Sequence, residues 1–168
     1  MSEELRAAAI AVLEACRARG FKVATAESCT GGLVAGALTD IAGSSDVLDR
    51  GFVTYSNEAK QQMLGVPADT IKKHGAVSRD TAEAMARGAL GKANADLVVA
   101  ITGIAGPGGG GADKPVGLVH FAAAARSGAL THAEMRYGDI GRGAVRHKSV
   151  LQALIMLREL AEKRGELV

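Results

Sequence analysis

Residues 24–32, with the sequence ATAESCTGG, decide the fold class because they join a strand to a helix through a short polar turn. The apolar run that begins at Phe21 is typical of a buried strand, and an alanine-rich helical pattern follows the turn through Leu38. The pattern therefore predicts a strand over 21–26 and a helix over 31–42. Such a junction presents small side chains and free backbone N–H groups at one point.

The polar residues of this turn support two interpretations. A nucleophile and an oxyanion site can share one strand–helix junction, with the small polar side chains and the free N–H groups of the turn as candidates. Alternatively, Ser28 and Thr30 cap the helix, which is the commoner use of such residues. The turn alone leaves both interpretations open.

Composition narrows the class of protein. The 168 residues fit one domain over 1–168, and the core must be built from Ala, Val, Leu and Ile because only 3% of residues are aromatic. No apolar run is long enough for a membrane span, the first residues do not form a signal peptide, and Cys16 and Cys29 give no disulfide framework. These features predict a cytoplasmic protein that contacts no membrane. The net charge of +2 is too small to indicate a nucleic-acid partner.

Helical and strand patterns alternate along the rest of the chain. We expect helices over 3–19, 58–64, 79–92 and 143–163, a β-rich segment over 48–55, and strands over 97–101, 116–125 and 130–137. The run from Leu97 to Ile101 is apolar throughout, which is typical of a strand covered on both faces. The predicted fold is a single-domain α/β protein, a three-layer α/β/α sandwich with a mixed β-sheet.

A glycine-rich loop over 103–115 follows the strand at 97–101. Ligands of open α/β sheets bind at the carboxyl ends of strands, and glycines let a backbone approach a ligand closely, which makes Thr102 and Gly103 candidate binding residues. The loop lacks the Gly-Lys-Ser/Thr ending of a P-loop, and no helix starts after it. A mobile connector is the alternative interpretation.

Tyr55, Asn57 and Lys60 form a third group at the end of the β-rich segment. Lys60 falls in the first turn of the next helix, where the helix dipole disfavours a cation and would lower the lysine pKa in a dry site. A neutral lysine is the general base that a Ser–Lys pair needs. Pairing with Glu58 would oppose this effect, and an exposed surface lysine is the simpler alternative.

Arg142 and Arg146 open the last helix, where arginines and free N–H groups suit a phosphate, although a solvated basic face is an equal alternative. The four histidines at 74, 120, 132 and 147 show no metal-ligand spacing, so no metal is expected.

Five segments in order resemble the CinA C-terminal domain family, and the resemblance runs from about residue 5 to 160. They cover residues 26–32, 51–60, 74–78, 102–107 and 114–117. The resemblance implies nicotinamide-nucleotide amidase activity, in which the carboxamide of nicotinamide mononucleotide becomes a carboxylate and ammonia leaves. It implies Ser28 as nucleophile and Lys60 as its partner, with a small-molecule nucleotide substrate and no cofactor.

In this mechanism Ser28 attacks the carboxamide carbon and Lys60 moves the proton. We expect Tyr55 to orient Lys60 or the ring, Asn57 to contact substrate, and N–H groups of Thr30–Gly32 or of Thr102 and Gly103 to hold the oxyanion. The family's arginine segment closely follows a Gly-Asp pair, whereas Ile140 and Gly141 intervene here, so the choice between Arg142 and Arg146 stays open. A binding module without turnover and an amidase for another amide are the alternatives. A homo-oligomer is compatible with the sequence.

Overall fold

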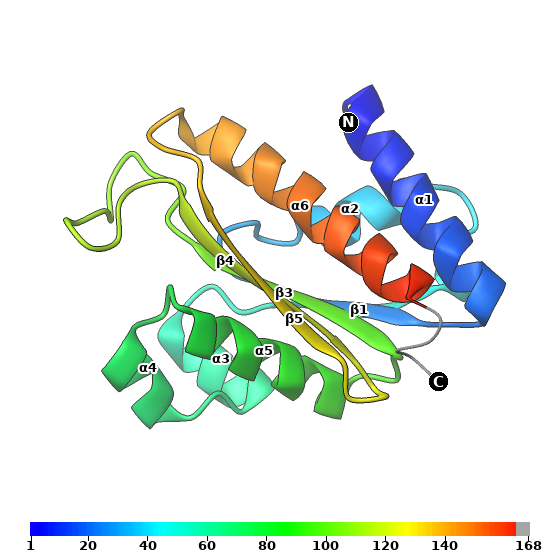
Figure 1. The fold of residues 1–168 in the computed structure, drawn as a ribbon, viewed down its shortest axis with the longest axis horizontal. Helices are drawn as coiled ribbons and strands as arrows, with labels where there is room; N and C mark the ends of the chain where they lie inside the picture. Colours follow the sequence, from blue (N-terminus) through cyan, green and yellow to red (C-terminus); the bar gives the residue numbers. More distant parts are fainter. Residues whose placement is uncertain (164–168) are drawn as a thin grey trace.

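The computed structural model describes residues 1–163, which form a five-stranded sheet with helices on both faces (Figure 1). The strand order is β2-β1-β3-β4-β5. β1 pairs in parallel with both β2 and β3, whereas β3, β4 and β5 pair antiparallel. The strands are β1 (Val23–Glu27), β2 (Leu48–Val53), β3 (Leu97–Gly103), β4 (Leu118–Ala125) and β5 (Leu130–Arg136). The predicted mixed sheet is confirmed.

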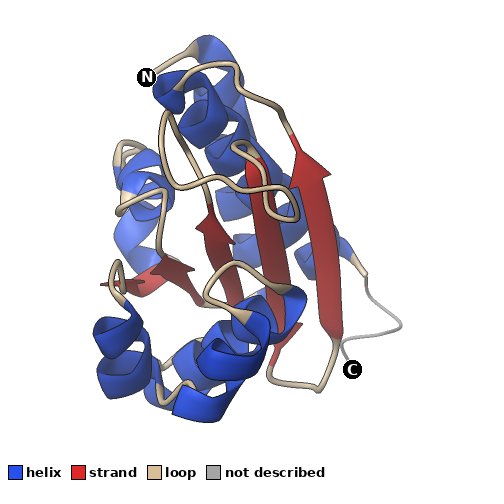
Figure 2. Ribbon diagram, turned by 90° about the vertical axis from the view of Figure 1, so that its left-hand side faces the viewer, coloured by secondary structure: helices blue, strands red, loops and turns tan. Residues whose placement is uncertain are grey.

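The helices form two layers, one on each face of the sheet (Figures 1 and 2). One layer contains α1 (Glu3–Arg19), α2 (Leu33–Thr39) and α6 (Arg142–Glu162), and the other contains α3 (Asn57–Leu64), α4 (Ala68–His74) and α5 (Arg79–Lys92). A short 3-10 turn, η1 (Ser44–Asp46), precedes β2. The three-layer α/β/α sandwich predicted from the sequence is therefore confirmed.

β3 lies at the centre of the core, and its side chains alternate between the two layers. Leu97, Val99 and Ile101 join the apolar cluster beneath α1, α2 and α6, whereas Val98 and Ala100 join the cluster beneath α3 and α5. On the second face α5 presents a run of buried alanines to the sheet. Gly88 lets α5 approach α3, because a Cβ at this position would lie 1.9 Å from the carbonyl oxygen of Leu64.

Most predicted elements occur within a few residues of their expected bounds, with one omission. α4 was not predicted; Pro67 is its N-cap residue, and the helix buries none of its side chains, so it carries no apolar periodicity that sequence analysis could detect. Residues 164–168 of the domain predicted over 1–168 lie outside the described residues.

The strand order creates a crevice at one edge of the sheet. From β1 the chain continues to β2 on one side, and β3 then adds to the other side of β1. Because these three strands are parallel, their carboxyl ends lie at the same edge, and such a change of direction is where open α/β sheets bind ligands. Ser28 follows β1 and Thr54 follows β2 at this edge.

Candidate active site

A cavity of about 250 Å³ opens at the carboxyl ends of β1 and β3. Seven of the eleven candidate residues line it: Ser28, Tyr55, Asn57, Lys60, Thr102, Gly103 and Arg142. The other four, Thr30, Gly31, Gly32 and Arg146, are not among its lining residues. The structure thus brings the β1 turn, the start of α3, the end of β3 and the start of α6 to one place.

Ser28 and Lys60 form a buried hydrogen-bonded pair in this cavity. The Lys60 Nζ lies 3.0 Å from the Ser28 Oγ, and it also donates to the backbone carbonyls of Thr54 at 2.9 Å and Tyr55 at 3.3 Å. The alternative of an exposed surface lysine is wrong, since only 1% of Lys60 is exposed. Ser56 caps α3, and its side chain accepts from the Ala59 N–H.

Burial lowers the pKa of Lys60, because the charged ammonium loses its hydration in the core. The counteracting pair with Glu58 is absent from the ion pairs of the described residues, and Lys60 contacts two carbonyls and a hydroxyl instead. Carbonyl groups stabilise an ammonium less than a carboxylate would. The site therefore favours a neutral lysine more than an ordinary surface does.

Cys29 lies next to Ser28 and differs from it in reactivity. The thiol is buried, and burial raises the pKa of Cys29 to about 11. Since the thiolate is the reactive form of cysteine, this shift makes the thiol less reactive at neutral pH than an ordinary cysteine. Cys16 is likewise a buried core residue, and both cysteines are free.

The turn after β1 (residues 28–32, called the nucleophile turn after the role expected of Ser28) is held by contacts with the Glu27 carboxylate. The Glu27 carboxylate accepts from the Thr30 hydroxyl at 2.7 Å and from the Gly32 N–H at 3.2 Å. The N–H of Gly31 donates to the Ser28 carbonyl. Ser28 and Thr30 are thus not side-chain caps of α2, because their hydroxyls face Lys60 and Glu27 respectively. Within residues 1–163 the N–H groups of Cys29 and Thr30 donate to no backbone carbonyl.

The glycine-rich loop forms one wall of the cavity through Ile104, Ala105, Gly106, Gly108 and Gly109. Gly106 has a φ of +84°, and a Cβ there would lie 2.5 Å from the Val116 Cγ1, so only glycine fits. Four of these residues, 105, 106, 108 and 109, have backbone N–H groups without an acceptor in the described part of the chain. The loop thus offers free donors beside the serine–lysine pair.

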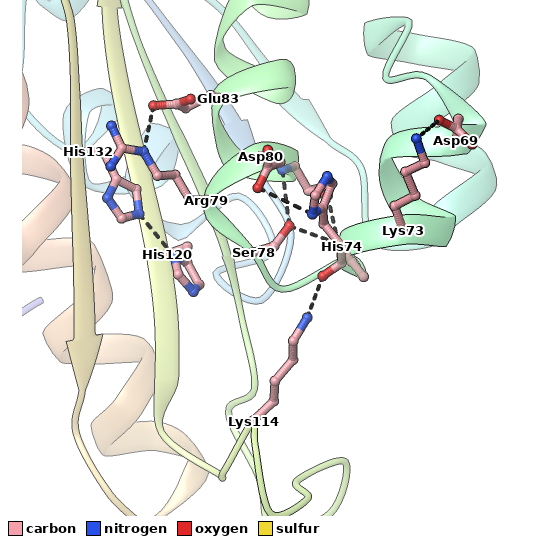
Figure 3. Close-up of polar contacts among 12 residues, drawn as sticks. Asp69, Lys73, His74, Ser78, Arg79, Asp80, Glu83, Lys114, His120 and His132 are labelled. Carbon is pink, nitrogen blue, oxygen red and sulfur yellow. Dashed lines mark hydrogen bonds and ion pairs between the residues drawn. The ribbon is translucent and has the colours of Figure 1, made fainter.

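Segment 74–78 forms a further wall through Ala76 and Val77, and it is tied to its neighbours by side chains. The Thr102 hydroxyl donates to the Ala76 carbonyl at 2.7 Å, and Lys114 of the glycine-rich loop donates to the His74 carbonyl (Figure 3). Ser78 caps α5 by accepting from the Thr81 N–H. These contacts join the glycine-rich loop to the start of α5.

Tyr55 and Arg142 meet at the cavity mouth. One Arg142 nitrogen donates to the Tyr55 hydroxyl at 2.9 Å, and the other donates to the Gly106 carbonyl at 2.8 Å. The contact between Tyr55 and Lys60 goes through the Tyr55 carbonyl, while the phenol ring is 59% exposed. Arg142 therefore bridges the segment before α3 and the glycine-rich loop.

Arg146 occupies a different position from Arg142. Its guanidinium donates to the Cys29 carbonyl at 3.0 Å and contacts the Thr30 carbonyl at 3.5 Å. It lines a separate cavity between α1, α2 and α6. Arg146 thus supports the nucleophile turn from the side opposite the Ser28 cavity.

The histidines lie outside the Ser28 cavity. His120 and His132 stack on neighbouring strands with 2.9 Å between Nδ1 and Nε2, and burial lowers the pKa of both (Figure 3). Within residues 1–163 no three His, Cys, Asp or Glu side chains gather as a metal site would require. No helix in this part of the chain is long and apolar enough to cross a membrane.

Sequence analysis missed three contributors to the site. Glu27 precedes the nucleophile turn and could have been noticed as a carboxylate inside an apolar strand pattern. Ala76 and Val77 carry no chemical signal, and only their membership of a family motif pointed to them.

Fold and cavity together define an α/β protein with a buried serine–lysine pair at the point where the strand order reverses. The model of the CinA C-terminal domain matches residues 5–161, and the chain belongs to this family. It is 56% identical over 142 residues to the nicotinamide-nucleotide amidohydrolase PncC of Escherichia coli K12, covering 84% of this chain and 85% of that protein.

Two further relatives agree with this assignment. A CinA-like protein of Geobacter sulfurreducens is 50% identical over 148 residues, which cover 88% of this chain and 35% of that protein. The crystal structure of the competence/damage-inducible protein CihA from Agrobacterium tumefaciens superposes with a TM-score of 0.95 at 56% identity, covering 96% of this chain and 98% of that one.

Proposed function

We propose that the protein is a nicotinamide-nucleotide amidohydrolase, which converts the carboxamide of nicotinamide mononucleotide to a carboxylate through an acyl-enzyme on Ser28. The observation that carries this proposal is the distance of 3.0 Å between the Ser28 Oγ and the buried Lys60 Nζ. The name of the PncC relative supports the choice of substrate. The two free thiols are in keeping with a reducing cytoplasm.

The contacts of Lys60 suit a neutral amine that acts as a base. A neutral amine has two N–H donors and one lone pair, and the Thr54 and Tyr55 carbonyls can take both donors. The lone pair then faces the Ser28 hydroxyl, which donates its proton along the 3.0 Å contact. The same geometry that buries Lys60 thus orients its basic electron pair.

In the acylation step, Lys60 takes the proton of Ser28 and passes it on to the leaving group. The Ser28 Oγ bonds to the carboxamide carbon as its proton passes to Lys60, and the carbonyl oxygen becomes an oxyanion that the free N–H groups of Cys29 and Thr30 can receive. The C–N bond then breaks, and Lys60 returns the proton to the departing nitrogen, which leaves as ammonia.

Deacylation uses the same groups in the reverse order. Water attacks the ester carbon, Lys60 accepts a proton from it, and the Ser28 oxygen regains that proton as the C–O bond breaks. Neither step needs a group beyond the Ser28–Lys60 pair and its backbone donors, so we propose a reaction without a cofactor.

We assign the phosphate of the nucleotide to Arg142. This residue lines the Ser28 cavity beside the free N–H groups of the glycine-rich loop, whereas Arg146 faces the other cavity. A guanidinium together with backbone N–H groups suits a phosphate. Tyr55 and Asn57, which line the same cavity, would then contact the intervening ribose or ring.

Ammonia release from a panel of amides tests the function. We expect the purified protein to release ammonia from nicotinamide mononucleotide, to act poorly on the nucleoside that lacks the phosphate, and to leave free nicotinamide unchanged. Faster release from another amide would replace the substrate, and binding of the nucleotide without ammonia release would indicate a binding module.

A further inference from the structure

Glu27 is a charged side chain in a fully buried position next to the nucleophile. It is the last residue of β1, its exposed fraction is 0%, and it directly precedes Ser28. A buried carboxylate is costly unless hydrogen bonds replace its lost hydration. The fold must therefore supply enough hydrogen-bond donors around the Glu27 carboxylate to offset this cost.

Five donors surround the Glu27 carboxylate. One oxygen accepts from the Thr30 hydroxyl at 2.7 Å and from the N–H groups of Gly32 and Val34 at 3.2 and 2.9 Å. The other oxygen accepts from the Thr25 hydroxyl at 3.1 Å and from the Ala35 N–H at 3.0 Å. The carboxylate therefore spans from β1 to the first turn of α2.

This arrangement fills the N-terminus of α2 from within the protein. The free N–H groups at a helix start usually form a site for an external anion. Here those of Gly32, Val34 and Ala35 already donate to Glu27. The oxyanion of a reaction at Ser28 is left with donors earlier in the turn, and the N–H groups of Cys29 and Thr30 are free for it.

We propose that Glu27 is a positioning residue for the reaction at Ser28. By holding the Thr30 hydroxyl and the start of α2, its carboxylate fixes the nucleophile turn so that the Ser28 Oγ faces Lys60 and the N–H groups earlier in the turn stay available to the oxyanion. The inference rests on the proposed function, because it assumes that Ser28 attacks the amide.

Two threonines on the same carboxylate provide a matched test. Thr25→Val and Thr30→Val each remove one hydroxyl donor to Glu27 from a fully buried residue without changing side-chain shape. Thr25 lies in β1, before the turn, whereas Thr30 lies within it. Both variants lose one contact of the same carboxylate, so a merely structural role predicts similar losses of stability and no difference in turnover.

We expect Thr30→Val to lower kcat for nicotinamide mononucleotide by roughly 10-fold or more with KM within about 3-fold of wild type, since a loss confined to kcat reports a transition-state effect. Thr25→Val should keep the wild-type kcat, and Thr30→Ser, which keeps the hydroxyl, should restore most of it. Glu27→Gln should lower kcat at least as much as Thr30→Val does, because the NH2 group of the glutamine amide would face N–H and O–H donors that now bind the carboxylate. Thermal unfolding curves, measured by circular dichroism, show whether each variant is folded.

Equal kcat values for Thr25→Val and Thr30→Val would overturn the proposal, and so would a folded Glu27→Gln protein with wild-type kcat. If Glu27→Gln does not fold, the threonine pair decides alone. A wild-type protein that releases no ammonia from any amide would overturn the proposed function instead. Ammonia release by the wild type is therefore measured before the variants.

Discussion

The nucleophile turn and the glycine-rich loop follow neighbouring strands at the same edge of the sheet. They differ in how many of their backbone polar groups form hydrogen bonds within the protein. In the turn, three of the five backbone N–H groups donate within the described part of the protein, that of Gly32 to Glu27, and Arg146 contacts the Cys29 and Thr30 carbonyls. In the loop, the N–H groups of Ala105, Gly106, Gly108 and Gly109 find no acceptor among the described residues. Ala105 and Gly106 are buried, whereas Gly108 and Gly109 are exposed to water. Because buried donors are nearly always satisfied, the unpaired N–H groups of Ala105 and Gly106 beside the cavity indicate a ligand. In the proposed function, the turn therefore carries the chemistry and the loop binds the substrate.

We expect the largest loss of turnover at the nucleophile turn, where Ser28 and Cys29 are adjacent but should differ in their effect. Ser28→Ala should lower turnover by at least ~10³-fold, because the covalent step loses its nucleophile. Cys29→Ala should retain most activity, since its thiol is buried with a pKa of about 11. Ammonia release measures both. An active Ser28→Ala protein that thiol alkylation inactivates would reverse the assignment.

Lys60 provides the next largest effect and a pH dependence. Lys60→Ala and Lys60→Arg should both lose about 10²- to 10⁴-fold in kcat, because arginine keeps the charge but cannot act as a base. The active form of Lys60 is neutral, so kcat/KM for wild type should rise with pH and level off once the pH exceeds the pKa of Lys60. Burial places that pKa below the usual 10.5.

Steady-state rates across the pH range measure this dependence. Near-normal rates for Lys60→Arg would mean that Lys60 acts through its charge. A wild-type rate that falls as the pH rises toward 10.5, the usual pKa of lysine, would mean the same.

The two arginines test the recognition side of the comparison. Arg142→Ala should weaken kcat/KM for the nucleotide by roughly 10- to 150-fold, as expected for one charge-assisted hydrogen bond of ~1.5–3 kcal/mol. It should also remove most of the preference over the nucleoside. Arg146→Ala should keep that preference, because the hydrogen bonds of Arg146 within residues 1–163 go to the Cys29 and Thr30 carbonyls, away from the Ser28 cavity. Full discrimination in both variants would assign the phosphate to the loop N–H groups alone.

The smallest expected effect compares two glycines of the loop. In Gly106→Ala, the new Cβ would clash with Val116, and alanine disfavours the positive φ at this position. We expect the cavity wall to shift slightly, which should lower kcat/KM about 10-fold. Gly108→Ala has open space around its Cβ and should be close to neutral. Kinetics on both variants, with thermal unfolding as a check on the fold, measures the difference. A neutral Gly106→Ala would mean that the loop does not shape the cavity.

Sequence analysis predicted the layers, the mixed sheet and the elements that meet at the cavity, because apolar periodicity and glycine punctuation are local signals. It placed Ser28 and Lys60 on a turn and a helix start, but spacing alone favoured an exposed Lys60. Its burial depends on how α3 packs against α5 and on the approach of the turn after β1, which no local pattern encodes. The five contacts of Glu27 and the opposite directions of Arg142 and Arg146 likewise depend on tertiary structure.

Transfer of the acyl group to hydroxylamine tests the acyl-enzyme most directly. An ester on Ser28 can be attacked by hydroxylamine in place of water, whereas direct attack of water on the amide passes through no such intermediate. With wild-type protein and nicotinamide mononucleotide, the account predicts a hydroxamate product that increases with hydroxylamine as the carboxylate product decreases, and no such product with Ser28→Ala. Carboxylate as the sole product at every hydroxylamine concentration, with ammonia release undiminished, would contradict it.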